Sequence, residues 1–199
     1  MSEISAEQVK ALREATGAGM MDCKKALQEA GGDVQRATEI LREKGLASAQ
    51  KRAGRSADQG VIESYIHFNR TVGVLVEVNC ETDFVANTDE FRTLAREIAI
   101  HIASAMPQWV NREDVPEDIL AAERRIYEAE ARQAGKPDNV IERIIEGKLE
   151  GFYKTVVLVD QPHVKDQDQT IRELVDEVSA KVGEKVAVRR FVRYKLGED

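Results

Sequence analysis

The stretch Val78–Phe91, VNCETDFVANTDEF, lies where two patterns of the chain meet. Before it, valine occupies every second position of Val72–Val78, which is typical of a β-strand with one buried face. After it, apolar residues recur along Phe91–Ile102 at the spacing of one helix face. We therefore expect a strand that ends at Cys80 and a helix over about 88–106, which is mixed α and β structure.

Phe84 is the open question in this stretch. It lies seven residues before Phe91, so helical spacing allows it to join the apolar stripe of the helix. Asn87 and Thr88 are of the types that often cap helices, and they separate Phe84 from the helix that follows. The residues alone leave two interpretations open: Phe84 fills the core, or it is offered to a partner.

Size and composition are those of a soluble chain with a sizeable core. The 199 residues are 42% hydrophobic and 33% charged, which suits one or two domains. Two cysteines favour a reducing compartment. The sequence starts without a signal-peptide pattern, and no apolar run approaches the roughly 20 residues of a membrane helix. We expect a cytoplasmic protein that does not bind membranes.

Residues 1–54 are predicted to form a small helical domain that ends in a linker. Ser5 and Asp33 are placed to cap the first and third of three short helices. Gly17 and Gly45 are placed to end the same two helices. The basic stretch that follows Gly45 is rich in small residues, and we interpret it as a partly helical linker.

Residues 55–199 are predicted to form an α+β module. A β-hairpin with a tight turn at Asn69 and Arg70 precedes the long helix, and a helical hairpin covers 114–151. TVVLVD at 155–160 is predicted to be a third strand, and KVAVRRFVRYK at 185–195 the last strand. Short antiparallel strands interrupted by helices favour the α+β class.

Groups for catalysis or metal binding are not apparent. No spacing of cysteine and histidine suggests a metal site, and GAGMMDCKK at 17–25 departs from a phosphate-binding loop. His101, inside an apolar helix, is expected to be a hydrogen-bonded core histidine, and Cys80 a buried thiol. We therefore expect neither an ordinary enzyme nor a cofactor.

Two functional hypotheses follow. The first is a protein-binding regulator that uses exposed apolar residues. The second is a nucleic-acid-binding module that uses the basic linker and RRFVRYK at 189–195. A net charge of −7 and the lack of interleaved aromatic and basic residues count against the second.

Three motifs carry a resemblance to a known family: TGAGMMDCKKAL at 16–27, VNCETDFVA at 78–86 and QPHV at 161–164. Together they resemble the bacterial elongation factor Ts family, and the resemblance covers essentially the whole chain. It implies a ubiquitin-associated-like N-terminal domain of three helices, followed by the α+β core. Longer members carry two copies of the core subdomain, whereas this chain has room for one.

The resemblance also implies a function. Members of the family are guanine-nucleotide exchange factors that bind elongation factor Tu in its GDP form and its nucleotide-free form. It implies that the Thr82–Val85 segment enters the nucleotide domain of that partner. There, Asp83 and Phe84 would displace the elements that hold magnesium, framed by Thr82 and Val85. GDP would then leave, and GTP would take its place. No reaction is catalysed in the chemical sense.

Further contacts are implied outside this segment. Four residues of the N-terminal domain are implied to touch the partner: Arg13, Met20, Met21 and Lys24. By pattern alone the two methionines also suit a core. His67 matches a histidine at the partner interface of the family, although it shares a strand face with Val61 and Tyr65, so a structural role stays open.

The short members that the chain resembles are homodimers, and we expect one here. The single core copy leaves contacts unfilled that the second copy supplies in longer members. The last predicted strand, RRFVRYK, contains no cysteine, so such a dimer would hold without a disulfide at that place.

Overall fold

The computed structural model describes residues 4–198, which form two compact units. Unit 1 comprises Met1–Val61, Val78–Leu94 and Glu173–Ala187, and unit 2 comprises Ile62–Glu77, Ala95–Arg172 and Val188–Asp199. The described residues contain eight α-helices, an antiparallel sheet of three strands and another of two, which confirms the α+β class. The boundary at residue 54 stays a prediction, and both predicted domains contribute residues to unit 1.

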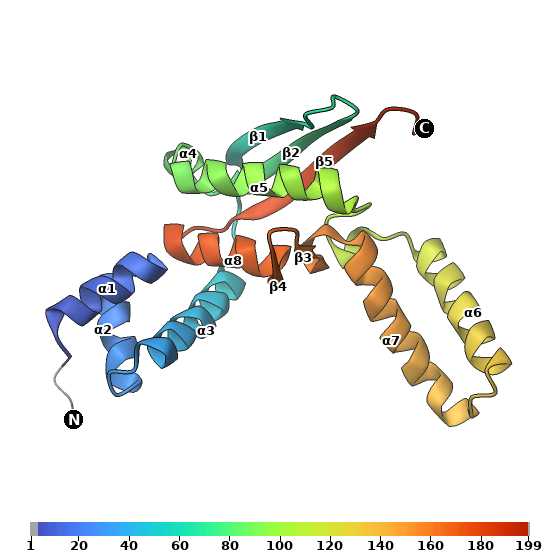
Figure 1. Ribbon diagram of the computed structural model, residues 1–199, viewed down its shortest axis with the longest axis horizontal. Helices are drawn as coiled ribbons and strands as arrows, with labels where there is room; N and C mark the ends of the chain where they lie inside the picture. Colours follow the sequence, from blue (N-terminus) through green and yellow to red (C-terminus); the bar gives the residue numbers. More distant parts are fainter. Residues whose placement is uncertain (1–3, 199) are drawn as a thin grey trace. The chain divides into compact units, whose positions relative to one another are not determined.

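Three helices open the chain: α1 (Ala6–Thr16), α2 (Met20–Glu29) and α3 (Val34–Arg52) (Figure 1). The predicted ends of α1 are confirmed. Ser5 forms a capping box with the third helical residue, and Gly17 ends the helix in the left-handed conformation, with φ 69°. The helices bury a small apolar core of their own, made of Val9, Leu12, Cys23, Ala26, Leu27, Ala37 and Ile40.

The predicted helix end at Gly45 is wrong, because α3 continues through this residue to Arg52. The reason is tertiary. A Cβ atom on Gly45 would lie 3.2 Å from the Cβ of Ala180 in helix α8 (Ile171–Val182), which is a tight contact. Glycine serves here for the close approach of two helices rather than for a left-handed turn. The non-helical part of the expected linker is correspondingly short, from residue 53 to residue 58.

The larger sheet has the strand order β1-β2-β5, built from β1 (Gln59–Ile66), β2 (Val72–Cys80) and β5 (Ala187–Lys195). The predicted turn between the first two strands is confirmed. Within it the Arg70 backbone N–H donates to the His67 carbonyl at 2.8 Å, and Arg70 adopts a positive φ of 59°. Along β2, Val74, Val76 and Val78 are buried, as the alternation of valines predicts.

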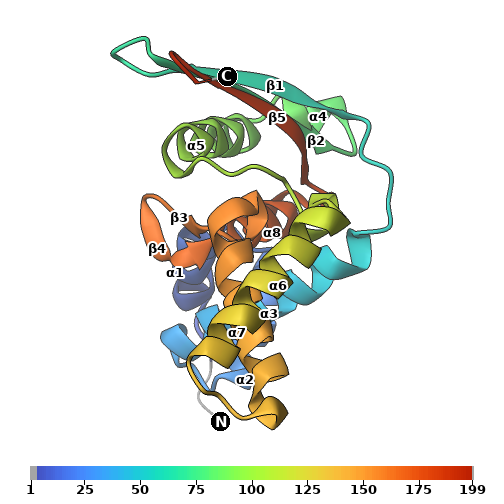
Figure 2. The same cartoon turned by 90° about the vertical axis from the view of Figure 1, so that its right-hand side faces the viewer.

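Helix α5 (Asp89–Ala105) follows the predicted helix closely. The Thr88 hydroxyl accepts a hydrogen bond from the Phe91 backbone N–H at 3.3 Å, so the predicted cap is confirmed. Within unit 2, the second half of α5 lies along one face of the sheet (Figure 2). Seven side chains of the expected strand face and helix stripe are buried: Val74, Val76, Val78, Phe91, Leu94, Ile98 and Ile102.

The third strand predicted at 155–160 is wrong. Helix α7 (Asp138–Val156) extends into this run, and a 3-10 turn, η2 (Leu158–Asp160), completes it. All side chains from 156 to 159 are buried, so the run is apolar because it is covered on every side, and periodicity cannot separate that case from a strand. The two-stranded sheet comes from β3 (Pro162–His163) and β4 (Asp166–Thr170). The polar sequence of β4 does not predict a strand.

The helical hairpin expected over 114–151 is present in unit 2. A short 3-10 turn, η1 (Arg112–Asp114), precedes helix α6 (Glu117–Gln133), and Gly135 turns the chain towards α7 with φ 67°. The hairpin has its own apolar core of Ala131, Ile141, Ile145 and Leu149. The Arg124 guanidinium reaches the Glu142 carboxylate across the hairpin at 2.9 Å.

His101 is buried and hydrogen-bonded, as predicted. Its Nε2 atom lies 2.9 Å from Oε1 of Gln161, and its Nδ1 atom accepts the Val164 backbone N–H at 3.3 Å. Burial is the main cause that lowers the pKa of His101 below its usual value. The helix α5 is thus tied to the QPHV motif at 161–164 through a neutral imidazole.

Candidate functional site

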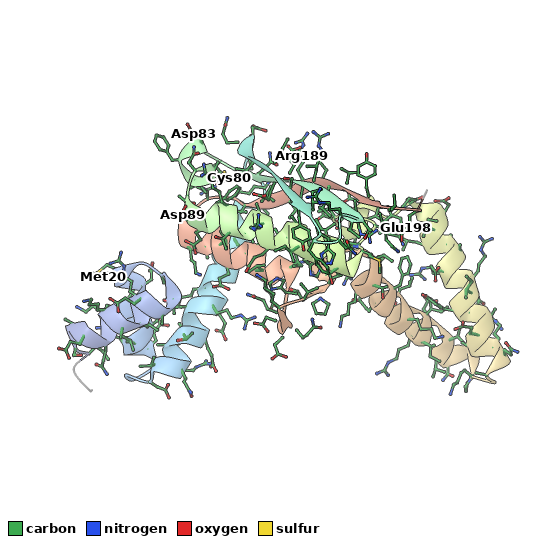
Figure 3. All side chains as sticks on the ribbon, turned by 45° about the horizontal axis from the view of Figure 1, so that its top comes forward. Met20, Cys80, Asp83, Asp89, Arg189 and Glu198 are labelled. Atoms are coloured by element: carbon green, nitrogen blue, oxygen red, sulfur yellow. The ribbon has the colours of Figure 1, made fainter. Side chains whose placement is uncertain are left out.

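The segment Thr82–Val85 lies at the start of a one-turn helix, α4 (Asp83–Ala86), directly after β2. Figure 3 labels Cys80 at the end of β2 and Asp83 at the start of this turn. Thr82 is the N-cap, and its hydroxyl accepts the Val85 backbone N–H at 3.4 Å. At the other end the Asn87 side-chain amide donates to the carbonyl of the first helical residue at 2.8 Å. Local capping therefore closes the turn at both ends.

The four residues of the segment divide into two that face inward and two that face outward. Val85 is 9% exposed and packs inward, and Thr82 is half-buried with its hydroxyl engaged. Asp83 is exposed, and Phe84 is 83% exposed. Phe91, which shares the helical spacing, is fully buried, so the interpretation of Phe84 as core is wrong. Only Asp83 and Phe84 are free to touch a partner.

Cys80, at the end of β2, is hydrogen-bonded to this turn. Its thiol is buried and donates a hydrogen bond to the Thr82 carbonyl at 3.1 Å. Burial is the main cause that raises the pKa of Cys80, with the nearby Glu184 carboxylate acting in the same direction. The expectation of a buried thiol is confirmed, because the Cys80 side chain is fully buried and its thiol is hydrogen-bonded.

The four residues implied for the N-terminal domain are all exposed. Arg13 lies on α1, and Met20, Met21 and Lys24 lie on the first turns of α2. The methionines are 57% and 63% exposed, so their alternative interpretation as core residues is wrong. Figure 3 labels Met20 at this helix. No polar side chain caps the start of α2, where Gly19 is the N-cap.

His67 is half-buried at the end of β1 and makes a structural contact. Its Nδ1 atom lies 2.9 Å from the Tyr65 hydroxyl oxygen. The His67 ring centroid lies 4.5 Å from that of Phe68, whose side chain is 88% exposed. The structural and the partner-binding interpretation of His67 are therefore compatible, since one ring nitrogen is engaged and the neighbouring aromatic ring is open to solvent.

An exposed apolar face on the three-stranded sheet was missed by the sequence analysis. We call it the outer sheet face, and its members are Ile62, Ile66, Leu75, Val192 and Tyr194 on the strands, with Phe68 in the turn between β1 and β2. All six belong to unit 2, and four of them are more than 60% exposed. The sequence does indicate this face, because β1 carries apolar residues on both sides: Ile62 and Ile66 alternate with Val61 and Tyr65. A face that stays in contact with water would carry polar residues instead.

The described residues offer little that would support a metal site or a membrane-spanning segment. Among residues 4–198, no cluster of three or more histidine, cysteine or acidic side chains is arranged to hold a metal ion. Within the same described residues, no helix has both the length and the apolar composition to cross a bilayer. What stands out is a set of large apolar side chains exposed on a folded surface, which is typical of proteins that bind other proteins.

Known proteins place the chain in a class and a family. A family model described as Elongation factor TS matches residues 2–198. Elongation factor Ts of Desulforamulus reducens is 58% identical over 198 residues, which cover 100% of this chain and 91% of the relative. Elongation factor Ts of Fervidobacterium nodosum is 55% identical over 196 residues, which cover 98% of this chain and 100% of the relative.

These matches establish that the chain is a translation elongation factor. It belongs to the elongation factor Ts family, as its three motifs predict.

Proposed function

We propose that this chain is the guanine-nucleotide exchange factor of elongation factor Tu. It would bind the GDP form, insert Asp83 and Phe84 so that magnesium is displaced, and promote GDP release until GTP binds. The observation that carries the proposal is Phe84, a large apolar side chain that is 83% exposed on a turn closed at both ends. Family membership supplies the partner.

The energetics of such an insertion are adequate. Burying a phenylalanine side chain contributes roughly 1.5–3 kcal/mol, and a side chain anchored in a pocket of a partner contributes about 2–4 kcal/mol. The coupling between factor and nucleotide is reciprocal, so GDP must weaken factor binding as much as the factor weakens GDP binding. The chain would act by binding, without a chemical step or a cofactor, in the cytoplasm where translation takes place.

Mixing the protein with elongation factor Tu that holds a fluorescent GDP analogue tests the proposal. We expect the release rate of the analogue to rise with factor concentration and to reach a plateau. Release that is independent of the factor at all concentrations would exclude the exchange function.

The N-terminal helices supply a second group of contacts in this proposal. Two contact regions on one chain raise the effective concentration of each at the partner. We expect the double change Met20→Ala and Met21→Ala to raise the half-saturating concentration for GDP release about tenfold, with a smaller change in maximal rate. Because both side chains are exposed, the melting temperature should not change. An unchanged half-saturating concentration would remove the methionines from the site.

We further propose that the protein is a homodimer through the outer sheet face. Five exposed apolar side chains on one sheet, with Phe68 in the adjoining turn, are an association surface. Sedimentation equilibrium at micromolar concentration should give twice the chain mass of 22.2 kDa, and Ile66→Asp should return it to that of one chain. Ile126→Asp, at a half-exposed position on α6, is the matched control and should stay dimeric. A single-chain mass for the unaltered protein would refute the proposal.

The nucleic-acid hypothesis has less support. The basic residues of β5 are matched by nearby carboxylates, since Arg189 and Arg190 both reach Glu77, at 3.5 and 2.7 Å. Arg193 is paired with Glu198 at 2.9 Å. A phosphate backbone would have to compete with these ion pairs, so our proposal includes no nucleic-acid partner.

A further inference from the structure

A glutamate far away in the sequence holds the base of the Thr82–Val85 segment. Oε2 of Glu184 accepts hydrogen bonds from the backbone N–H groups of Glu81 and Thr82, at 3.1 and 2.9 Å. Oε1 of the same carboxylate accepts the Thr82 hydroxyl at 2.7 Å. One side chain therefore makes three hydrogen bonds to two consecutive residues, and bonds to an ionised acceptor are the stronger kind.

Glu184 is itself fixed by the end of α8. Gly183 ends this helix in the left-handed conformation, with φ 77°, which glycine adopts without strain. The Ser179 hydroxyl, buried in the last turn, donates to the Glu184 carbonyl at 2.6 Å. The helix end thus sets both the direction of the chain and the position of the glutamate backbone.

A second carboxylate makes the return contact. Oε1 of Glu81 accepts the backbone N–H of Lys185 at 2.6 Å and the Arg55 guanidinium at 3.2 Å. The bond from Lys185 is the main cause that lowers the pKa of Glu81. The two chain segments therefore hold each other, each through a carboxylate that binds the backbone of the other.

These contacts leave no polar atom of Thr82 free for a partner. Its N–H and hydroxyl bind Glu184, and its hydroxyl also accepts the Val85 N–H. Its carbonyl accepts the Cys80 thiol at 3.1 Å and the Ala86 N–H at 3.2 Å. With Thr82 fixed in this way, the backbone direction of the next two residues, Asp83 and Phe84, is fixed as well.

We propose that Glu184 is a positioning residue for nucleotide exchange, which holds Asp83 and Phe84 in the orientation that enters the partner. The inference rests on the proposed exchange function. A segment that is already ordered before binding loses less conformational entropy when it inserts. Glu184 acts on the partner only through this segment, whereas the N-terminal helices and the rest of the chain can still bind.

We therefore expect a change at Glu184 to affect the maximal rate of GDP release more than the half-saturating concentration. Glu184→Ala should lower the maximal rate of GDP release on the order of tenfold, the effect of losing one charge-assisted hydrogen bond or more. The half-saturating concentration should change less than about twofold, because the other contact regions are intact. Glu184→Gln keeps one acceptor oxygen and should fall between. Glu177→Ala, which removes a carboxylate of α8 that pairs with Lys181 at 2.9 Å, is the matched control and should behave as the unaltered protein.

A double change separates positioning from a general loss of structure. If Glu184 acts through Phe84, then Glu184→Ala should have almost no further effect on the maximal rate in a Phe84→Ala background. Equal fold losses in the two backgrounds would overturn the proposal. Should Glu184→Ala fail to fold, Thr82→Val and Thr82→Ser form a substitute pair. Serine keeps the hydroxyl that Glu184 binds and valine does not, so the serine variant should lose less of the rate than the valine variant.

Amide hydrogen exchange distinguishes failure of this inference from failure of the exchange function. In Glu184→Ala the amides of Glu81 and Thr82 should lose protection, and in Glu177→Ala they should keep it. If the unaltered protein does not accelerate GDP release, the exchange function fails, and with it the positioning role. If the unaltered protein accelerates release but Glu184→Ala loses protection without losing rate, the positioning role alone is overturned.

Discussion

Replacing Phe84 with alanine is expected to lower the stimulated rate of GDP release about 100-fold, which corresponds to roughly 3 kcal/mol for an anchor side chain in a pocket. The fold should be unaffected, because the ring is 83% exposed and fills no space in the core. Stopped-flow release of a fluorescent GDP analogue from elongation factor Tu measures the first effect, and thermal unfolding measures the second.

Leu196→Ala is the control for this experiment. Leu196 is also an exposed apolar side chain, at 81%, but it lies outside the candidate site. Its removal should leave both the rate and the melting temperature unchanged. A Phe84→Ala variant that stimulates GDP release at the full rate would show that the exposed ring does not drive the release.

Acidification is expected to destabilise the fold through His101. The Gln161 amide donates to the Thr155 carbonyl at 2.7 Å and to the Ala105 carbonyl at 3.3 Å, so its Oε1 must face the imidazole as an acceptor. His101 therefore donates from Nε2, and Nδ1 carries no proton because it accepts the Val164 N–H. The neighbouring imidazole of His163, with ring centroids 6.0 Å apart, adds no negative charge that would favour a second proton.

The sign of the pH effect follows from the lowered pKa of His101 in the folded state. The unfolded chain takes up the proton near its ordinary value of about 6.5, whereas the folded chain resists it. The stabilising contribution is thus complete above about 6.5 and falls as the pH drops towards the folded-state pKa, with a slope of at most roughly 1.4 kcal/mol per pH unit. Urea unfolding between pH 5 and pH 8 measures this slope.

His101→Gln isolates the contribution of the imidazole. The glutamine amide offers an NH₂ donor group and an oxygen acceptor without a titrating group, so the variant should lose about 1–3 kcal/mol at neutral pH from imperfect bonding. Its dependence on pH below about 6.5 should be flatter than that of the unaltered protein. Parallel pH curves for His101→Gln and the unaltered protein would assign the effect to other groups.

The candidate site was predictable from sequence only in part. Spacing left Phe84 open between core and surface, because a position seven residues before Phe91 fits a helix stripe as well as it fits a turn. The resemblance to a family selected the outward interpretation. Alternation in β1 assigns its side chains to two faces, but it does not say which of the two apolar faces the core covers.

What the sequence by itself determined are the features whose cause is local. Ser5, Asp33 and Thr88 cap helices because each side chain reaches a backbone N–H three residues ahead. Gly17 and Gly183 end helices because the residue that follows the last helical turn adopts the left-handed conformation, which glycine does without strain. Alternation fixed the buried face of β2, since side chains on a strand point to opposite sides in turn.

What only the tertiary structure decided are the features whose cause lies far away along the chain. Gly45 lets α3 pass close to Ala180 and does not end the helix, although the same residue type ends α1. The run at 155–160 ends helix α7 and enters the 3-10 turn η2, and its four apolar side chains are buried, a pattern that an apolar sequence shares with a buried strand. Glu184 reaches Thr82 across 102 positions of sequence. Hydrogen bonds and packing act through space, and no local pattern contains the partner that folding brings into place.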